Sequence, residues 1–115
     1  MAEAMALSLP VISTNCFTGP SEMLMEEYDY DRVRKNFEEC DYGILTPDYE
    51  VCGTEAAILQ LSNAMVHLLS NKELMKKYSA ISAQRVVEFS ENSALERFEE
   101  IFGTLIKRRE NIDKE

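Results

Sequence analysis

Basic residues are scarce in this sequence of 115 residues. It has 12 Lys and Arg against 21 Asp and Glu, which gives a formal net charge of -9. A surface that binds nucleic acid needs clustered Lys and Arg to neutralise phosphates, and so does docking on an anionic membrane. The charge balance therefore argues against both kinds of partner, and we expect no nucleic acid to bind.

Cysteine and histidine are also sparse. The three cysteines are odd in number and form no Cys-x-x-Cys pair: Cys16, Cys40 and Cys52. A disulfide framework is not expected, and the pattern favours a reducing compartment. The single histidine, His67, lies among apolar residues of an expected helix with no second ligand three or four residues away. We therefore expect it to have neither a metal-binding nor a catalytic role.

Long apolar runs and targeting signals are missing. No stretch reaches the roughly 18 apolar residues of a membrane span. The first residues, Met-Ala-Glu-Ala-Met-Ala-Leu, carry an acid where a secretory signal would be basic. We expect a cytoplasmic chain. The helical composition already evident at Glu3 leaves little room for a cap, so we also expect that sequence upstream is missing.

The N-terminal part alternates helix and strand signals. Residues 2–8 favour a helix that Pro10 ends, and residues 11–14 are a β-branched apolar run typical of a buried strand. A polar loop leads to Ser21, which we expect to cap a short helix over residues 22–25. This order is typical of an open α/β fold.

The middle segment, residues 26–41, is dense in charge and tyrosine. We expect a surface excursion there, helical around residues 32–39, whose role the sequence leaves open. A second strand is predicted over residues 42–46, where Pro47 and Asp48 stop it.

The remainder favours helices. Residues 54–69 form one, and capping boxes at Ser70–Glu73 and Ser93–Glu96 start two more. The last helix has an apolar stripe at three- and four-residue steps, which predicts a core-facing side: Leu95, Phe98, Phe102 and Leu105. Two strands are too few for an independent sheet. Either the sheet pairs with missing sequence, or two copies of the chain complete each other as a homodimer.

The informative segment for chemistry is the helix–strand–loop–helix unit from Glu3 to Glu22. Ligands of open α/β sheets bind beyond the carboxyl ends of strands, and a helix N-terminus there suits a phosphate group. A carboxylate beside that crevice can accept hydrogen bonds from a ribose diol. The unit is therefore suited to a nucleoside diphosphate, although the pattern is generic.

The motif Glu-Ala-Met-Ala-Leu-x-Leu-Pro-Val-Ile-Ser-Thr-Asn-Cys, followed by Gly-Pro-Ser-Glu, makes the case more specific. It closely resembles retaining glycosyltransferases built of two Rossmann-like domains, of the group 1 (family 4-like) type. Tyr-Gly-Ile-Leu-Thr-Pro at 42–47 is similar to the family's strand after the donor loop. In that family two glutamates lie eight positions apart; Glu3 matches the second, and the first would precede Met1. Asn15 departs from the pattern, because Asp is common there.

The resemblance implies a site for a nucleoside diphosphate sugar, the donor substrate, without a metal or other cofactor. The family's second glutamate binds the donor ribose, the helix that follows it lies near the diphosphate, and the loop after the strand lines the pocket. Six residues match these parts: Glu3, Ala4, Thr14, Asn15, Gly19 and Glu22. The residues themselves also permit a plainer role for Glu3 and Glu22, as first-turn acids favoured by the helix dipole.

The resemblance therefore predicts an α/β fold: a partial Rossmann-like parallel sheet with few strands and a helix-rich C-terminal half. Residues 1–105 would be the C-terminal portion of a nucleotide-sugar-binding domain and 106–115 a polar tail. The enzyme would transfer a sugar to an acceptor hydroxyl with retention, in polysaccharide or glycolipid biosynthesis. It would be cytoplasmic, peripheral to the inner membrane face, with the saccharide or glycolipid acceptor held by a missing N-terminal domain. The alternative is a non-catalytic α/β module for dimerisation or protein interaction.

Overall fold

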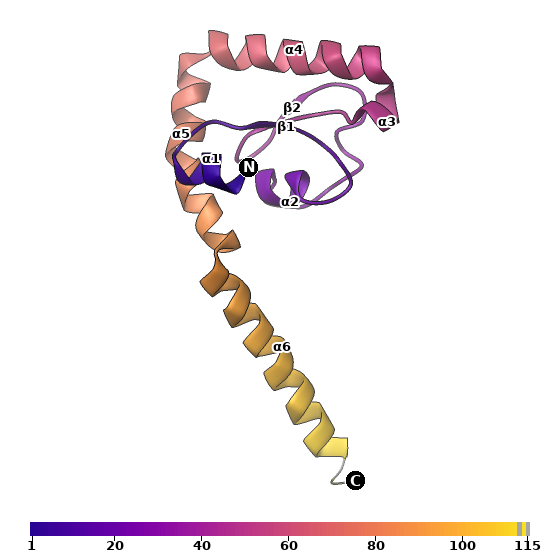
Figure 1. Ribbon diagram of the computed structural model, residues 1–115, viewed down its shortest axis with the longest axis vertical. Coiled ribbons are helices and arrows are strands. Elements are labelled where there is room, and N and C mark those ends of the chain that lie inside the picture. Colours follow the sequence, from indigo (N-terminus) through magenta and orange to yellow (C-terminus); the bar gives the residue numbers. More distant parts are fainter. Residues whose placement is uncertain (113, 115) are drawn as a thin grey trace.

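A small mixed sheet with helices on both faces forms the body of the protein, and one long helix projects from it (Figure 1). The computed structural model describes residues 1–112 and 114. Its elements follow the order α1 (Ala2–Ala6), β1 (Ile12–Thr14), α2 (Pro20–Leu24), β2 (Glu38–Glu39), β3 (Ile44–Thr46), α3 (Tyr49–Cys52), α4 (Thr54–Ser70), α5 (Lys72–Val86), the 3-10 turn η1 (Val87–Phe89) and α6 (Glu91–Ile112).

The sheet has the order β1-β3-β2. β1 and β3 are parallel, with Ile12 opposite Ile44 and Thr14 opposite Thr46, whereas β2 is antiparallel to β3. The predicted α/β class with a small sheet and a helix-rich C-terminal half is confirmed, and so is the parallel pairing of the two predicted strands. The antiparallel strand β2 lies inside the excursion that the sequence predicted to be partly helical. That helix prediction around residues 32–39 is wrong.

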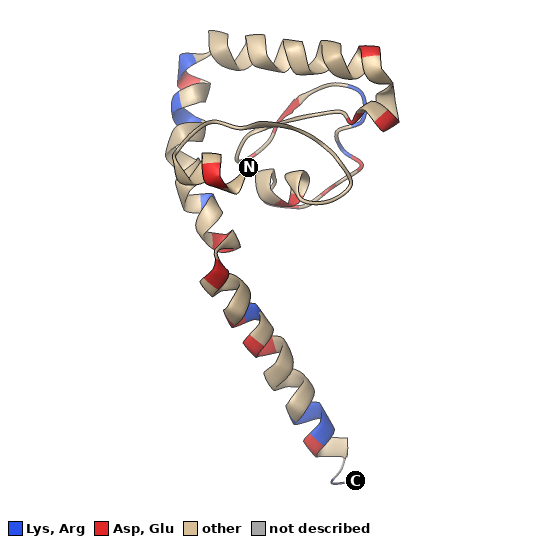
Figure 2. Ribbon diagram, viewed as in Figure 1, with Lys and Arg blue, Asp and Glu red and all other residues tan. Residues whose placement is uncertain are grey.

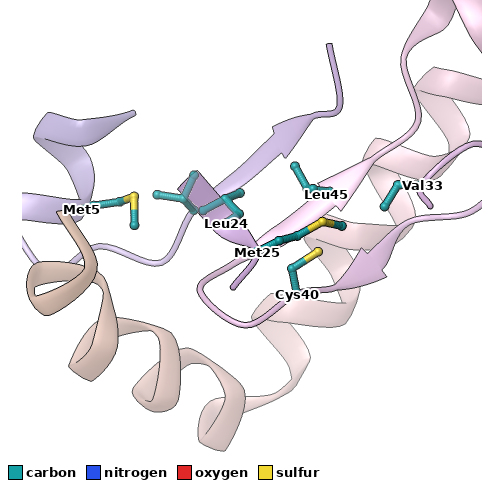
Figure 3. Packing of buried hydrophobic residues seen from close by; sticks show 7 residues of the cluster. Met5, Leu24, Met25, Val33, Cys40 and Leu45 are labelled. Carbon is teal, nitrogen blue, oxygen red and sulfur yellow. The ribbon is translucent and has the colours of Figure 1, made fainter. Parts of the chain in front are cut away.

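Successive residues of β3 pack into two separate hydrophobic cores. Leu45 packs with Met5 of α1 and with Leu24 and Met25 at the end of α2 (Figure 3). Ile44 points to the other face, where it packs with residues of α4 and α5. Because side chains alternate along a strand, one short central strand anchors helices on both faces.

Three expected caps are displaced. Gly19 occupies the N-cap of α2 at φ 98°, with Pro20 at the first helical position, and Ser21 is buried one residue further on. The cap of α5 is Asn71, whose side chain accepts from the Leu74 amide at 3.0 Å, rather than Ser70. α6 begins at Glu91, so the predicted cap Ser93 lies inside its first turn. Glycine takes the N-cap position of α2 because the backbone there has a positive φ, which serine adopts less readily.

The apolar stripe of the last helix does not face the core of this chain. α6 extends away from the body, and Leu95, Phe98, Phe102 and Leu105 are all more than half exposed. The helix also continues through Ile112, so residues 106–112 of the expected polar tail are helical, while positions 113 and 115 lie outside the described residues. Within the described part of the chain, no helix is both long enough and apolar enough to cross a bilayer.

Candidate functional site

The carboxyl ends of β1 and β3 lie side by side at one edge of the sheet. The Asn15 amide, just after β1, donates to the carbonyl of Thr46, the last residue of β3, at 2.7 Å. Both strands run parallel, so the loops that follow them leave the sheet at the same edge. In open α/β sheets this edge is where ligands bind.

Asn15 is a buried anchor for the excursion as well as a predicted pocket residue. Its side chain is only 2% exposed, and Nδ2 donates to the carbonyls of Tyr30 at 2.8 Å and Val33 at 3.4 Å. The ring of Tyr30 also meets Phe17 edge-on, at 5.4 Å between centroids. The excursion is therefore fastened to the carboxyl end of β1 and covers part of the loop that follows it.

Three buried polar oxygens belong to the segment that follows β1 and to the last residue of β3. Asn15 Oδ1, Thr46 Oγ1 and Ser21 Oγ have no hydrogen-bond partner within the described part of the protein. Leaving such an atom unsatisfied costs about 1–3 kcal/mol, so native proteins usually supply a water or a ligand group. Thr46 and Ser21 were not predicted as polar lining; the signal for Thr46 was a hydroxyl at the end of an otherwise apolar strand.

Glu3 lies in the first turn of α1, and its carboxylate is exposed to solvent. Its side chain is 92% exposed, and its Oε2 lies 3.5 Å from the N-terminal ammonium of Met1. A hydrogen bond with its own backbone amide and the nearby ammonium lower the pKa of Glu3 below its ordinary value. Glu3 is therefore an ionised acceptor whose oxygens remain available. A first-turn acid stabilised by the helix dipole would look the same.

α1 and α2 contribute to the same buried cluster on one face of the sheet. Met5 and Leu24 belong to the same buried cluster, and the half-buried Ala4 packs against it (Figure 3). The other predicted residues lie where loops and helices begin: Thr14 is exposed at the end of β1, Gly19 is half-buried at the N-cap of α2, and Glu22 is exposed in its first turn. The two ends of the motif therefore belong to helices that share one buried cluster, and Thr14 and Asn15 lie at the carboxyl edge of the sheet.

Arg85 supports this unit, and the sequence analysis did not single it out. Its guanidinium, 8% exposed, donates to three carbonyls at the end of α2: Glu22 at 2.9 Å, Met23 at 3.1 Å and Met25 at 3.0 Å. It also bonds Glu88 at 2.6 Å. The spacing in the sequence could have indicated its burial. Arg85 lies seven residues after Tyr78 and therefore on the same, buried side of α5.

The remaining polar groups lie elsewhere. His67 Nε2 is 2.6 Å from Glu39 Oε1, and its ring lies 5.4 Å from that of Phe37, so its contacts are those of a packed side chain. Among the described residues, no three His, Cys, Asp or Glu side chains are grouped so as to hold a metal ion. A cavity of about 750 Å³ at the turn between α4 and α5 is lined by none of the six predicted residues.

Comparison with known proteins gives one informative relative. No family model matches the chain, and no solved structure matches it either. The chain is 34% identical, over 92 aligned residues, to an uncharacterized glycosyltransferase of Methanocaldococcus jannaschii. The alignment covers 67% of this chain and 21% of the relative, so the chain spans about a fifth of the length of the curated relative it matches.

Proposed function

We propose that this chain is the donor-binding portion of a retaining glycosyltransferase, which transfers a sugar from a nucleoside diphosphate sugar to an acceptor hydroxyl. The observation that carries the proposal is the 34% identity to a protein described as a glycosyltransferase. The position of Asn15 at the carboxyl edge of the sheet supports it, because nucleotides bind at such edges.

The residues of this edge have the chemistry that a nucleotide sugar requires. The exposed, ionised Glu3 can accept hydrogen bonds from the two ribose hydroxyls. Asn15, whose backbone is bonded to the end of β3, marks the edge at which the diphosphate and sugar would lie.

We expect this chain to supply donor binding only, and not the groups that assist the departing diphosphate. The departing diphosphate needs positive charge or aligned donors in the transition state. The six predicted residues include no Lys or Arg, and the chain as a whole carries a net charge of -9. We therefore expect the 115-residue chain to bind donor weakly and not to transfer sugar. The acceptor, a saccharide or glycolipid, would be held by other parts of a longer protein at the cytoplasmic membrane face.

The test uses the longest form of the protein that transfers sugar. Glu3→Ala should weaken donor binding by about 1–3 kcal/mol, because charged hydrogen bonds to ribose are lost. The matched control is Glu55→Ala, an exposed acid in the first turn of α4, which should leave donor affinity unchanged. Equal donor affinity in wild type and Glu3→Ala, by calorimetric titration, would remove Glu3 from the site.

A second candidate function rests on a different observation. The apolar face of α6 is exposed along its whole length, as expected of a helix made for association. A non-catalytic dimerisation module would need this face and no donor pocket. The two candidates predict different results. A dimerisation module would associate without binding nucleotide, whereas a donor-binding portion would bind nucleotide.

A further inference from the structure

The loop after β1 carries an exposed aromatic ring close to the carboxyl edge of the sheet. Phe17 follows soon after Asn15, whose backbone amide donates to the last residue of β3, and it is 73% exposed. An aromatic ring open to water leaves much apolar surface unburied, which is unfavourable. Because nucleotides bind at such edges, this ring is a candidate contact for a flat ligand group.

The ring of Phe17 has one aromatic neighbour, Tyr30 of the excursion. The two ring centroids are 5.4 Å apart and the ring planes meet at 74°, which is the edge-to-face geometry that aromatic pairs favour. Tyr30 is half-buried, whereas Phe17 is exposed. An edge-on contact covers only part of a ring, so Phe17 keeps a flat surface for another planar group.

Asn15 determines where Tyr30 lies. Its Nδ2 donates to the carbonyls of Tyr30 at 2.8 Å and Val33 at 3.4 Å, and Asn15 is buried. A carboxylate could not replace this amide, because it has no hydrogen to donate and would face two carbonyl oxygens. Asn15 is therefore a positioning residue, which acts on Phe17 through Tyr30.

The turn that carries Tyr30 is closed by its own hydrogen bonds. The Asp31 amide donates to Asp29 Oδ1 at 3.1 Å, and the Arg32 amide donates to the Asp29 carbonyl at 3.4 Å. Arg34 also donates to the Asp31 carboxylate at 2.6 Å. Tyr30 is thus held by its own turn as well as by the end of β1. Phe17 is positioned before a ligand arrives, which lowers the entropic cost of stacking.

The charge of the excursion indicates which part of a nucleotide would lie beside Phe17. Both signs occur along residues 26–41, with seven Asp and Glu against three Lys and Arg (Figure 2). Two of the bases, Arg32 and Arg34, form ion pairs within the excursion. Asp29 and Asp31 flank Tyr30, so a phosphate beside this ring would be repelled, whereas a nucleobase is uncharged.

We propose that the base of the nucleotide stacks on the ring of Phe17, with Tyr30 supporting this ring and Asn15 holding Tyr30. The inference rests on the proposed donor site and adds which part of the donor meets the loop after β1. The diphosphate lies further along the edge, away from Asp29 and Asp31. Every base has a flat face, so this contact strengthens binding without choosing between bases.

The first test compares ligands with and without the base. The 115-residue chain is titrated with the diphosphates of uridine, guanosine and adenosine and with ribose 5-diphosphate, followed by amide chemical shifts. Phe17→Ala should weaken binding of each nucleoside diphosphate by about tenfold and leave ribose 5-diphosphate unaffected. Phe17→Tyr should retain the wild-type affinities. The matched control is Tyr28→Ala, which removes another exposed ring of the excursion and should change nothing.

A double-variant cycle tests the support that Tyr30 gives to Phe17. Tyr30→Leu should weaken nucleoside diphosphate binding in the wild-type chain, and so should Asn15→Asp. Neither change should weaken it further in the Phe17→Ala background, because the ring that they position is then absent. Tyr30→Leu leaves the buried amide of Asn15 in place, so it tests the same contacts even where Asn15→Asp prevents folding.

Two results would overturn the inference while leaving the donor site in place. In one, nucleoside diphosphates bind and Phe17→Ala does not change their affinity. In the other, Phe17→Ala weakens ribose 5-diphosphate as much as the nucleoside diphosphates, which would indicate a general loss of structure. A wild-type chain that binds no nucleoside diphosphate would refute the donor site itself, and this inference with it.

Discussion

Replacement of buried Arg85 should destabilise the fold more than removal of any exposed charge, because the Arg85 guanidinium bonds the last carbonyls of α2. A helix leaves its last carbonyls without partners, and in this protein the guanidinium satisfies three carbonyls there. The same group lies over the rings of Tyr42 and Phe89, 4.5 and 5.1 Å from their centroids. One side chain of α5 therefore holds the α2 end of the candidate site in place.

The magnitude follows from what Arg85→Met leaves behind. Met retains much of the aliphatic packing but donates no hydrogen bond, so the carbonyls of Glu22, Met23 and Met25 lose a charged partner. Removing one partner from a buried charged network costs about 3–5 kcal/mol. Since Glu88 is half exposed and can be solvated, we expect the lower end, about 3 kcal/mol. Arg85→Lys should lose somewhat less, because its ammonium keeps the positive charge and can donate to some of the carbonyls, although it cannot reach all three.

The assay is urea unfolding followed by circular dichroism at low protein concentration. Lys76→Met is the matched control, since Lys76 lies on the same helix and forms an ion pair at the same three-residue spacing, but with both partners exposed. It should cost no more than about 0.5 kcal/mol. A loss below about 1 kcal/mol for Arg85→Met would refute the view that this residue holds α2.

Two glycines and one cysteine yield further predictions. Gly43→Ala should lower the free energy of unfolding by about 1–3 kcal/mol, because its new Cβ would lie 2.7 Å from the Val11 carbonyl oxygen. Gly103→Ala has open space around it and should raise the free energy of unfolding by roughly 0.5–1 kcal/mol, because alanine favours a helix. Urea unfolding titrations measure both changes. Burial and nearby Glu38 raise the pKa of the Cys40 thiol from 9.0 to about 11. The unfolded chain therefore loses this proton first, so folding stability should fall as pH rises from about 9 to 11. Cys40→Ala should reduce that fall, and an unchanged pH profile would contradict the assignment.

The sequence predicted the elements whose signals are local. The β-branched run at 11–14, the apolar run at 42–46 and the long Ala- and Leu-rich stretch of α4 became elements of the expected kind. β2 has only two residues, and its pairing with β3 depends on a partner further along the chain, which no local pattern reveals. The apolar face of α6 was recognised as a face to be buried, but periodicity does not identify what buries it.

The candidate site stays a prediction, and the contacts around it that the sequence did not reveal are long-range ones. The motif predicts site residues around β1 and α2, and the structure places two of them, Thr14 and Asn15, at the carboxyl edge of the sheet. Arg85 and Thr46 reach the same region from α5 and β3, far along the sequence, so their roles depend on tertiary contacts. The anchoring of Tyr30 by Asn15 is likewise a long-range contact, and it gives the excursion a place beside the predicted pocket.

The most direct test of the central claim is a titration of the isotope-labelled chain with nucleoside diphosphates, followed by amide chemical shifts. The proposed donor site predicts weak, saturable shifts confined to residues 3–4, 14–22 and Thr46, with Glu3→Ala removing them and Glu55→Ala preserving them. Diphosphates of several bases are compared, with inorganic phosphate as the control for simple anion binding. Shifts confined to other surfaces, or none at millimolar nucleotide, would contradict the assignment of this edge as a nucleotide-sugar site.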